Sequence, residues 1–140
     1  MNIIRKLLIV DDNPGDVDLC RIMFEPAGCV REFLSAATGD EALEILKAMR
    51  TAPPEVVLLD INMPRMSGFE LVAAYEAWRD EHLRPDEPLP AVVMLTSSEQ
   101  PRERERAASH PLVKGFLVKP PSADDARWLA HEFGSAPAAD

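Results

Sequence analysis

Four short apolar runs, each followed by a polar residue, constrain the fold of this chain more than any other feature of the sequence. The runs are Leu7–Val10, Val56–Leu59, Ala91–Leu95 and Phe116–Val118. They are rich in Val, Ile and Leu and show no alternation of polar and apolar residues, which is typical of central parallel strands covered on both faces. A fifth and more polar segment, Arg31–Ala37, is predicted to form an edge strand.

Segments with the apolar spacing of helices lie between these runs. They cover Asp16–Ala27, Asp40–Arg50, Gly68–Glu81, a mostly charged stretch at Pro101–His110, and the residues after a capping box at Ser122–Asp125. Because strands and helices alternate, we predict a doubly wound α/β fold with a five-stranded parallel sheet in the order 2-1-3-4-5. The proline-rich segment Leu83–Pro90 is predicted to be a surface loop.

Composition and charge exclude several classes of function. The chain has 140 residues, which fits one domain, and its net charge of -9 disfavours nucleic acids, whose phosphates are neutralised by Lys and Arg. The apolar runs are too short to cross a bilayer, no signal peptide is recognisable, and a basic membrane anchor is disfavoured, so we expect a cytoplasmic protein without a membrane partner. Cys20 and Cys29 form no CxxC pair, which argues against a zinc site or a disulfide framework.

The polar residues that end the apolar runs predict a metal site. Asp11 and Asp12 follow the first run, Asp60 the second, Thr96 the third and Lys119 the fourth. In open parallel sheets, ligands bind beyond the carboxyl ends of the strands where the winding direction switches, so the three acids should converge. Converging carboxylates raise one another's pKa or require a cation, and Mg²⁺ commonly binds carboxylates, waters and a phosphate oxygen.

At these residues the chain resembles the response-regulator receiver family of two-component signalling systems. The resemblance extends from Leu7 to about Phe133 and rests on an ordered set of segments: Val-Asp11-Asp12-Asn, Leu-Leu-Asp60-Ile-Asn62-Met-Pro64 with Gly68, Leu-Thr96-Ser-Ser, and Phe116-Leu-Val-Lys119-Pro120. Each segment alone is weak, but the ordered set at the strand ends is specific. The resemblance implies a flavodoxin-like receiver domain over residues 1–134, followed by a flexible tail at 135–140 and no output domain.

The resemblance also implies the roles of the acids. Asp60 would be the phosphoacceptor, and Asp12 and Asp60 would bind Mg²⁺ through their carboxylates. Asp11 would act through a metal-bound water, and Asn62 would bind Mg²⁺ through its backbone carbonyl. A carboxylate can attack an in-line phosphoryl donor while a metal offsets the charge on the phosphoryl oxygens.

Three further positions follow from the same resemblance. Lys119 would pair with Asp60 before transfer or with the phosphoryl group, and the hydroxyl of Thr96 would donate to a phosphoryl oxygen after transfer. The Lys119–Pro120 peptide bond would be cis. Phe116 would be an aromatic coupled to Thr96 and would move inward with it, although a simple packed strand residue is an equal alternative.

A sensor histidine kinase is the partner that the resemblance implies, and the chain itself would not be an enzyme. The Asp-Asn-Pro-Gly-Asp start of the first helix and the long loop at Leu83–Pro90 resemble stand-alone regulators paired with bacterial phytochrome kinases. Because the first helix and the loop after Lys119 flank Asp60, we expect them to form the kinase-docking face. The exposed residues of that face are predicted to be Pro14, Val17, Asp18, Arg21 and Pro121.

Trp128 is predicted to point outward from the last helix. Ala126, Leu129, Ala130 and Phe133 share one stripe of that helix, and Trp128 lies roughly 200° from Ala126 at about 100° per residue. One interpretation is a homodimer, or target docking, through the face formed by the fourth helix, the fifth strand and the last helix. The alternative is that Trp128 folds over the helix end or packs beneath the tail.

Three other functions compete with the receiver interpretation. A phosphatase of the haloacid-dehalogenase type needs a second Asp two residues after its nucleophile, where this chain has Asn62. A flavodoxin-like ligand-binding module needs a phosphate loop rich in Gly, Ser or Thr, where this chain has the acidic segment Asp11–Pro14. A pseudo-receiver should lack part of the set of acids, Thr and Lys. Mg²⁺-dependent labelling by a small phosphodonor, without turnover of other substrates, separates these possibilities.

Overall fold

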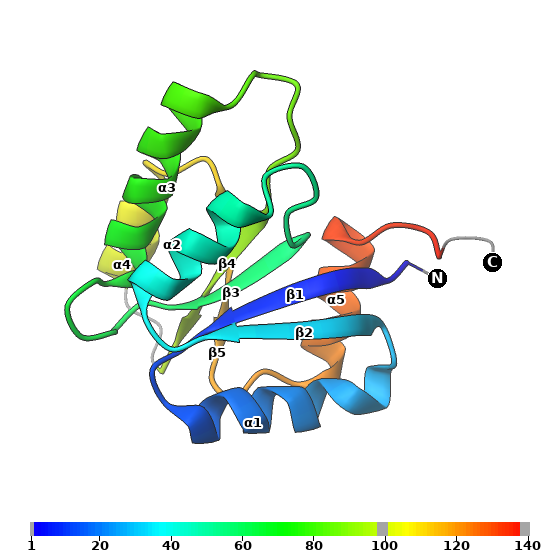
Figure 1. Ribbon diagram of the computed structural model, residues 1–140. Coiled ribbons are helices and arrows are strands. Elements are labelled where there is room, and N and C mark those ends of the chain that lie inside the picture. The colour runs from blue at the N-terminus through cyan, green and yellow to red at the C-terminus, as the bar shows by residue number, and fades with distance from the viewer. Residues whose placement is uncertain (1, 98–100, 138–140) are drawn as a thin grey trace.

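The computed structural model describes residues 2–97 and 101–137 as one parallel sheet between two layers of helices (Figure 1). The strands are β1 (Ile4–Val10), β2 (Val30–Ala36), β3 (Val56–Asp60), β4 (Ala91–Thr96) and β5 (Val113–Val118). The helices are α1 (Pro14–Phe24), a 3-10 turn at Glu25–Ala27, α2 (Gly39–Ala48), α3 (Gly68–His82), α4 (Pro101–Ala107) and α5 (Ala123–Phe133). Among the described residues, no helix is long and apolar enough to cross a membrane.

The sheet has the predicted strand order. The order is β2-β1-β3-β4-β5, and every neighbouring pair of strands is parallel. The chain winds from β1 outward to β2 and then returns to β3 on the other side of β1. The winding direction therefore switches between β1 and β3, and the carboxyl ends of these two strands lie side by side at the edge where ligands bind in such sheets.

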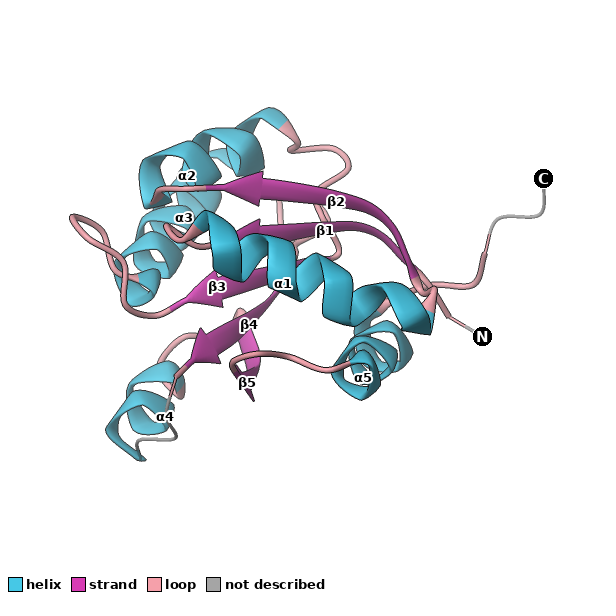
Figure 2. Ribbon diagram, turned by 90° about the horizontal axis from the view of Figure 1, so that it is seen from below, coloured by secondary structure: helices cyan, strands magenta, loops and turns pink. Residues whose placement is uncertain are grey.

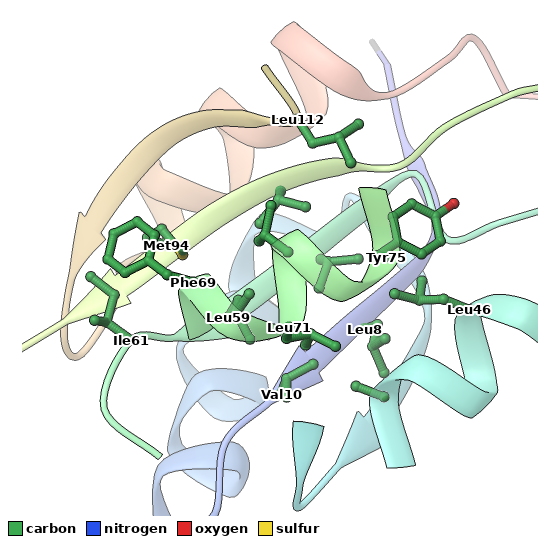
Figure 3. Close-up of a cluster of buried hydrophobic side chains, with 14 of the residues drawn as sticks. Leu8, Val10, Leu46, Leu59, Ile61, Phe69, Leu71, Tyr75, Met94 and Leu112 are labelled. Atoms are coloured by element: carbon green, nitrogen blue, oxygen red, sulfur yellow. The ribbon is translucent and has the colours of Figure 1, made fainter. Parts of the chain in front are cut away.

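Both faces of the sheet are buried, as the continuous apolar runs predict. Leu8 and Val10 of β1 belong to one core cluster, whereas Leu7 and Ile9 belong to the other, because successive side chains point to opposite faces of a strand. The first cluster is covered by α2, α3 and α4 and is shown in Figure 3, and the second is covered by α1 and α5, which lie on the other side of the sheet in Figure 2.

The edge strands of the sheet are those that the predicted strand order gives. Strand β2 is an edge strand, as its polar sequence predicts. The apolar run Phe116–Val118 is typical of a central strand, whereas the predicted strand order places it at an edge; β5 does form the opposite edge, and Val118 is 43% exposed. A short apolar run alone does not distinguish the two positions, because an edge strand with one face on the core also favours Val, Leu and Phe.

Capping residues define where the helices begin. The side chain of Asn13 accepts hydrogen bonds from the N–H groups of Gly15 and Asp16, so α1 starts at Pro14 and not at Asp16 as the apolar spacing predicted. The predicted capping box of α5 is confirmed, because Ser122 and Asp125 exchange side-chain and backbone hydrogen bonds. Helix α4 ends three residues before the predicted boundary, at Ala107.

The two irregular segments are held more firmly than their sequences suggest. The guanidinium of Arg50 binds Glu87 in the predicted Leu83–Pro90 loop through two hydrogen bonds of 3.0 Å each. Residue 135 was expected to begin a flexible tail, but Ser135 pairs with Ile3 through two backbone hydrogen bonds of 2.8 and 2.9 Å. Residues 138–140 of the predicted tail lie outside the described residues.

Candidate functional site

Three acids converge at the carboxyl ends of β1 and β3, at the sheet edge toward which the strand arrows point in Figure 2. Oxygen atoms of Asp11, Asp12 and Asp60 all lie within 4.8 Å of one another. Asp11 and Asp60 are 3% and 7% exposed, whereas Asp12 faces solvent. The predicted convergence is therefore confirmed, and it combines two buried carboxylates with one that is accessible.

The ammonium of Lys119 lies among the acids. Its Nζ atom is 2.7 Å from Oδ2 of Asp11, 3.2 Å from Oδ2 of Asp16 and 3.3 Å from Oδ2 of Asp60. The backbone N–H of Lys119 donates to the carbonyl of Thr96 at 2.9 Å, and this bond ties the end of β5 to the end of β4. The Lys119–Pro120 bond is cis, as the resemblance implied.

The two buried carboxylates already accept hydrogen bonds from backbone N–H groups. Oδ1 of Asp11 accepts from the N–H of Asn13 at 3.0 Å, and Oδ1 of Asp60 accepts from the N–H of Asn62 at 3.1 Å. Both oxygens of Asp11 therefore have protein partners, one at the backbone and one at Lys119. Asp60 has the same kind of partners, because its Oδ2 lies 3.3 Å from Lys119, whereas Asp12 is exposed. The division between a direct ligand at Asp60 and a water-mediated one at Asp11 therefore stays a prediction.

Burial and charge act in opposite directions on these groups. Burial raises the pKa of Asp60, and the hydrogen bond from Asn62 and the charge of Lys119 offset only part of that effect, while the charge of Asp11 adds to it. Burial lowers the pKa of Lys119, but its hydrogen bond to Asp11 and the charges of Asp60 and Asp11 outweigh burial and raise the pKa overall. Since carboxylates of Asp11, Asp16 and Asp60 all lie within 3.3 Å of this one ammonium, the site has negative charge that a second cation could offset.

The donor set matches Mg²⁺ in chemistry. Carboxylate oxygens, together with a backbone carbonyl such as that of Asn62, are hard ligands of the kind that Mg²⁺ takes, and Mg²⁺ keeps several waters. The exposed carboxylate of Asp12 leaves the cluster open to water and to a phosphoryl group. The residues present therefore fit the metal that the sequence predicts.

Gly68 allows α3 to begin next to the site. A Cβ atom at this position would lie 2.7 Å from the backbone oxygen of Asp60 and 3.2 Å from Cα of Ile61. Real Cβ atoms do not approach backbone atoms so closely, so a larger residue would push α3 away from β3. This explains why the glycine belongs to the set of segments around Asp60.

Thr96 and Phe116 lie on the neighbouring strands. Thr96 is 3% exposed at the end of β4, one residue after Leu95, which pairs with Asp60. Phe116 is half-buried on β5 and packs against the cluster covered by α2, α3 and α4. The coupled movement of these two side chains stays a prediction.

The docking residues predicted from the sequence are only partly exposed. Pro14, Asp18 and Arg21 are exposed, but Val17 is 8% exposed and packs in the second core cluster, and Pro121 is buried, so the prediction was wrong for these two. Val17 shares a stripe with the buried residues Cys20 and Phe24, and that helical spacing already indicates burial.

Sequence reasoning missed the exposed apolar residues of α1 and one acid. Leu19 and Ile22 are 40% and 61% exposed, and Leu19 lines a cavity of about 130 Å³ together with Lys119, Pro120 and Pro121. Asp16, which contacts Lys119, was also missed. The site was predicted from the residues that end the strands, and Asp16 lies in the first turn of the next helix.

Trp128 is 39% exposed, so the predicted outward orientation is confirmed. Its ring nevertheless lies over β5, because a Cβ atom at Gly115 would meet the indole at 3.1 Å. The ring also contacts Phe133 edge-on, with the centroids 5.7 Å apart. The homodimer through the α4, β5 and α5 face stays a prediction.

The comparison with known families agrees with this geometry. A family model described as the response regulator receiver domain matches residues 7–128. The chain belongs to this family. The receiver domain is 29% identical over 131 residues to the two-component response regulator ORR1 of Oryza sativa subsp. japonica, and the match covers 90% of this chain. This chain spans 54% of the rice protein, about half of its length.

Solved structures of receiver proteins share the fold. A two-component response regulator from Cytophaga hutchinsonii has a TM-score of 0.80 at 26% identity, and the match covers 94% of this receiver domain and 97% of that chain. The bacteriophytochrome response regulator AtBRR has a TM-score of 0.72 at 32% identity over 98% of this chain and 97% of its own.

Proposed function

We propose that Asp60 accepts a phosphoryl group from a sensor histidine kinase in the presence of Mg²⁺, and that this phosphorylation switches a partner-docking face. The observation that carries the proposal is the position of the Asp60 carboxylate between Lys119 and the other two acids of the cluster. Receiver domains generally bind Mg²⁺ in such an acidic pocket, and Asp12, Asp60 and the backbone carbonyl of Asn62 would hold it here. We propose that this reaction takes place in the cytoplasm.

The proposed step is an in-line displacement at phosphorus. A carboxylate oxygen of Asp60 attacks the phosphorus of phosphohistidine, the P–N bond breaks, and the imidazole takes the electron pair. Mg²⁺, when bound, offsets negative charge on the phosphoryl oxygens. Lys119 moves its contact from the Asp60 carboxylate to a phosphoryl oxygen, and the hydroxyl of Thr96 donates to another.

We propose that the chain acts as a switch and not as an enzyme. A phosphatase of the haloacid-dehalogenase type would need an acid at position 62, where the side chain is an amide. The acidic segment Asp11–Pro14 argues against phosphate binding in the manner of a flavodoxin. The complete set of acids, Thr96 and Lys119 favours phosphotransfer over a pseudo-receiver.

A bacteriophytochrome kinase is the proposed phosphoryl donor. The support is the match to the bacteriophytochrome response regulator AtBRR over nearly the full length of both chains. The start of α1 and the loop after Lys119 are proposed to flank Asp60 and to form the docking face. On α1, the exposed residues Asp18 and Arg21 supply charges that a kinase helix would meet. Leu19 and Ile22 add exposed apolar area on the same helix.

Treatment with acetyl phosphate and Mg²⁺ should add one phosphoryl group per chain. Intact-mass spectrometry measures the added mass, and omission of Mg²⁺ is the control, because the ammonium of Lys119 is then the one cation described among the acids of the cluster. No added mass under conditions that label an established receiver domain would contradict the proposed function, and so would turnover of small phosphate esters by this chain.

Asp12→Ala should weaken Mg²⁺ binding more than Asp11→Ala. The first variant loses a direct ligand and the second a group that acts through water, so we expect losses of about 100-fold and about tenfold in affinity. Calorimetric titration measures both, with Asp40→Ala as a control, since Asp40 is an exposed acid in the first turn of α2. Equal affinities of the two variants would contradict the assignment.

Charge reversal at Asp18 or Arg21 should slow phosphotransfer from the cognate kinase by about tenfold, because charges at an interface rim steer encounter. The same variants should be labelled by acetyl phosphate at the wild-type rate. Glu44→Lys is a matched control, because Glu44 is exposed on α2 in the opposite helix layer. If both rates fell together, the defect would lie in the site and the docking proposal would fail.

A further inference from the structure

Asp16 brings the first turn of α1 into direct contact with the proposed phosphorylation site. Its Oδ2 atom lies 3.2 Å from Nζ of Lys119, slightly closer than Oδ2 of Asp60 at 3.3 Å. The side chain of Asp16 is 40% exposed, whereas that of Asp11 is 2% exposed. The contact therefore links a solvent-facing helix to the buried part of the site.

Three carboxylates surround the ammonium of Lys119. A lysine ammonium has three N–H donors and no acceptor. Here three carboxylate oxygens, from Asp11 after β1, Asp16 in α1 and Asp60 in β3, lie within 3.3 Å of Nζ. The ammonium donates hydrogen bonds to Asp11 and Asp16 and forms an ion pair with Asp60, so it is held between three elements.

We propose that Asp16 is a positioning residue for Lys119, which keeps part of the ammonium's contact on α1 and prevents it from closing fully onto Asp60. Without the Asp16 carboxylate, Lys119 has two acids left and moves toward them. The Asp60 oxygens are then less available to Mg²⁺ and to a phosphoryl donor. The consequence for phosphorylation rests on the proposed function, whereas the position of the ammonium does not.

A general charge effect is the main alternative, because any acid near the site attracts a cation. Asp40 separates the two explanations. It is also an exposed aspartate in the first turn of a helix that follows a strand, and Asp40→Asn removes the same charge as Asp16→Asn. A contact with Lys119 predicts an effect for Asp16 alone, and Asp16→Glu, which keeps the carboxylate, should restore much of it.

Nuclear magnetic resonance of the lysine ammonium groups tests the positioning role in unphosphorylated, Mg²⁺-free protein. The chain has four lysines, and we expect Lys119 to give a slowly exchanging signal because its ammonium is hydrogen-bonded and 20% exposed. In Asp16→Asn that signal should change its chemical shift or disappear, because the ammonium protons exchange faster with water. In Asp40→Asn and Asp16→Glu it should persist. An unchanged Lys119 signal in Asp16→Asn would overturn the proposal.

Mg²⁺ titration and labelling by acetyl phosphate test the consequence. We expect about threefold weaker Mg²⁺ binding and about threefold slower labelling in Asp16→Asn, the size of effect that a partly exposed ion pair supports. Asp16→Asn and Asp40→Asn with the same affinity and rate would overturn the proposal. A wild-type chain without labelling would refute the proposed function instead, and the ammonium signal would still decide the role of Asp16.

Discussion

Asp60→Asn protein should take up no phosphoryl group from acetyl phosphate, and it should unfold at a higher temperature than the wild type at pH 7. The first effect follows because an amide oxygen is not a nucleophile toward phosphorus under these conditions. The second follows because burial raises the pKa of Asp60, so the ionised carboxylate is less stable in the folded chain than in the unfolded chain. Asn removes that penalty and can still accept the hydrogen bond from Asn62.

The pH dependence of the stability gain has a definite sign. A carboxyl with a raised pKa holds its proton more tightly in the folded state, so the folded state loses stability as pH rises through the range in which Asp60 ionises. The gain from Asp60→Asn should therefore be present at pH 7 and disappear below the ordinary pKa of aspartate, about 3.9. Thermal unfolding followed by circular dichroism at both pH values measures it, and a variant less stable than the wild type at pH 7 would contradict the argument.

Lys119→Met should lower the free energy of unfolding by about 3 kcal/mol, because removal of one partner leaves a buried charge without compensation. The charge concerned is that of Asp11, whose side chain is 2% exposed and 2.7 Å from the ammonium. Urea unfolding followed by tryptophan fluorescence measures the loss. Labelling of this variant by acetyl phosphate should also be slow, since the phosphoryl group loses its ammonium partner.

The double variant Asp11→Asn/Lys119→Met tests whether the pair explains the loss. In the Asp11→Asn background no buried charge is stranded at that position, so Lys119→Met should cost less than about 1 kcal/mol there. Losses that simply add would show that the two residues do not depend on each other. The loss of stability in Lys119→Met would then come from lost packing of the lysine side chain and not from its lost charge.

The sheet and the acids at its edge could be predicted because their signals are local. A run such as Val56–Leu59 predicts a buried strand, and the residue that follows it emerges at the carboxyl edge of a parallel sheet. Parallel pairing then brings Asp11, Asp12 and Asp60 together without knowledge of any side-chain contact.

The remaining features depend on contacts between segments distant in the sequence. Asp16 reaches Lys119 across more than one hundred residues, and nothing in the helix sequence distinguishes it from a first-turn acid that stabilises the helix dipole. The burial of Pro121 depends on how the loop after β5 packs against the rest of the chain. The pairing of Ser135 with Ile3 joins the two ends of the fold, and small polar residues give no sign of it.

Borohydride reduction followed by peptide mass mapping tests the central claim most directly, because hydride converts an aspartyl phosphate into homoserine and marks the phosphorylated position permanently. After treatment with acetyl phosphate and Mg²⁺, homoserine should be found at position 60 and at no other aspartate, and it should be absent when Mg²⁺ is omitted. Homoserine at Asp11, Asp12 or another position, or none at all while a known receiver domain is marked in parallel, would contradict the assignment of Asp60 as the phosphoacceptor.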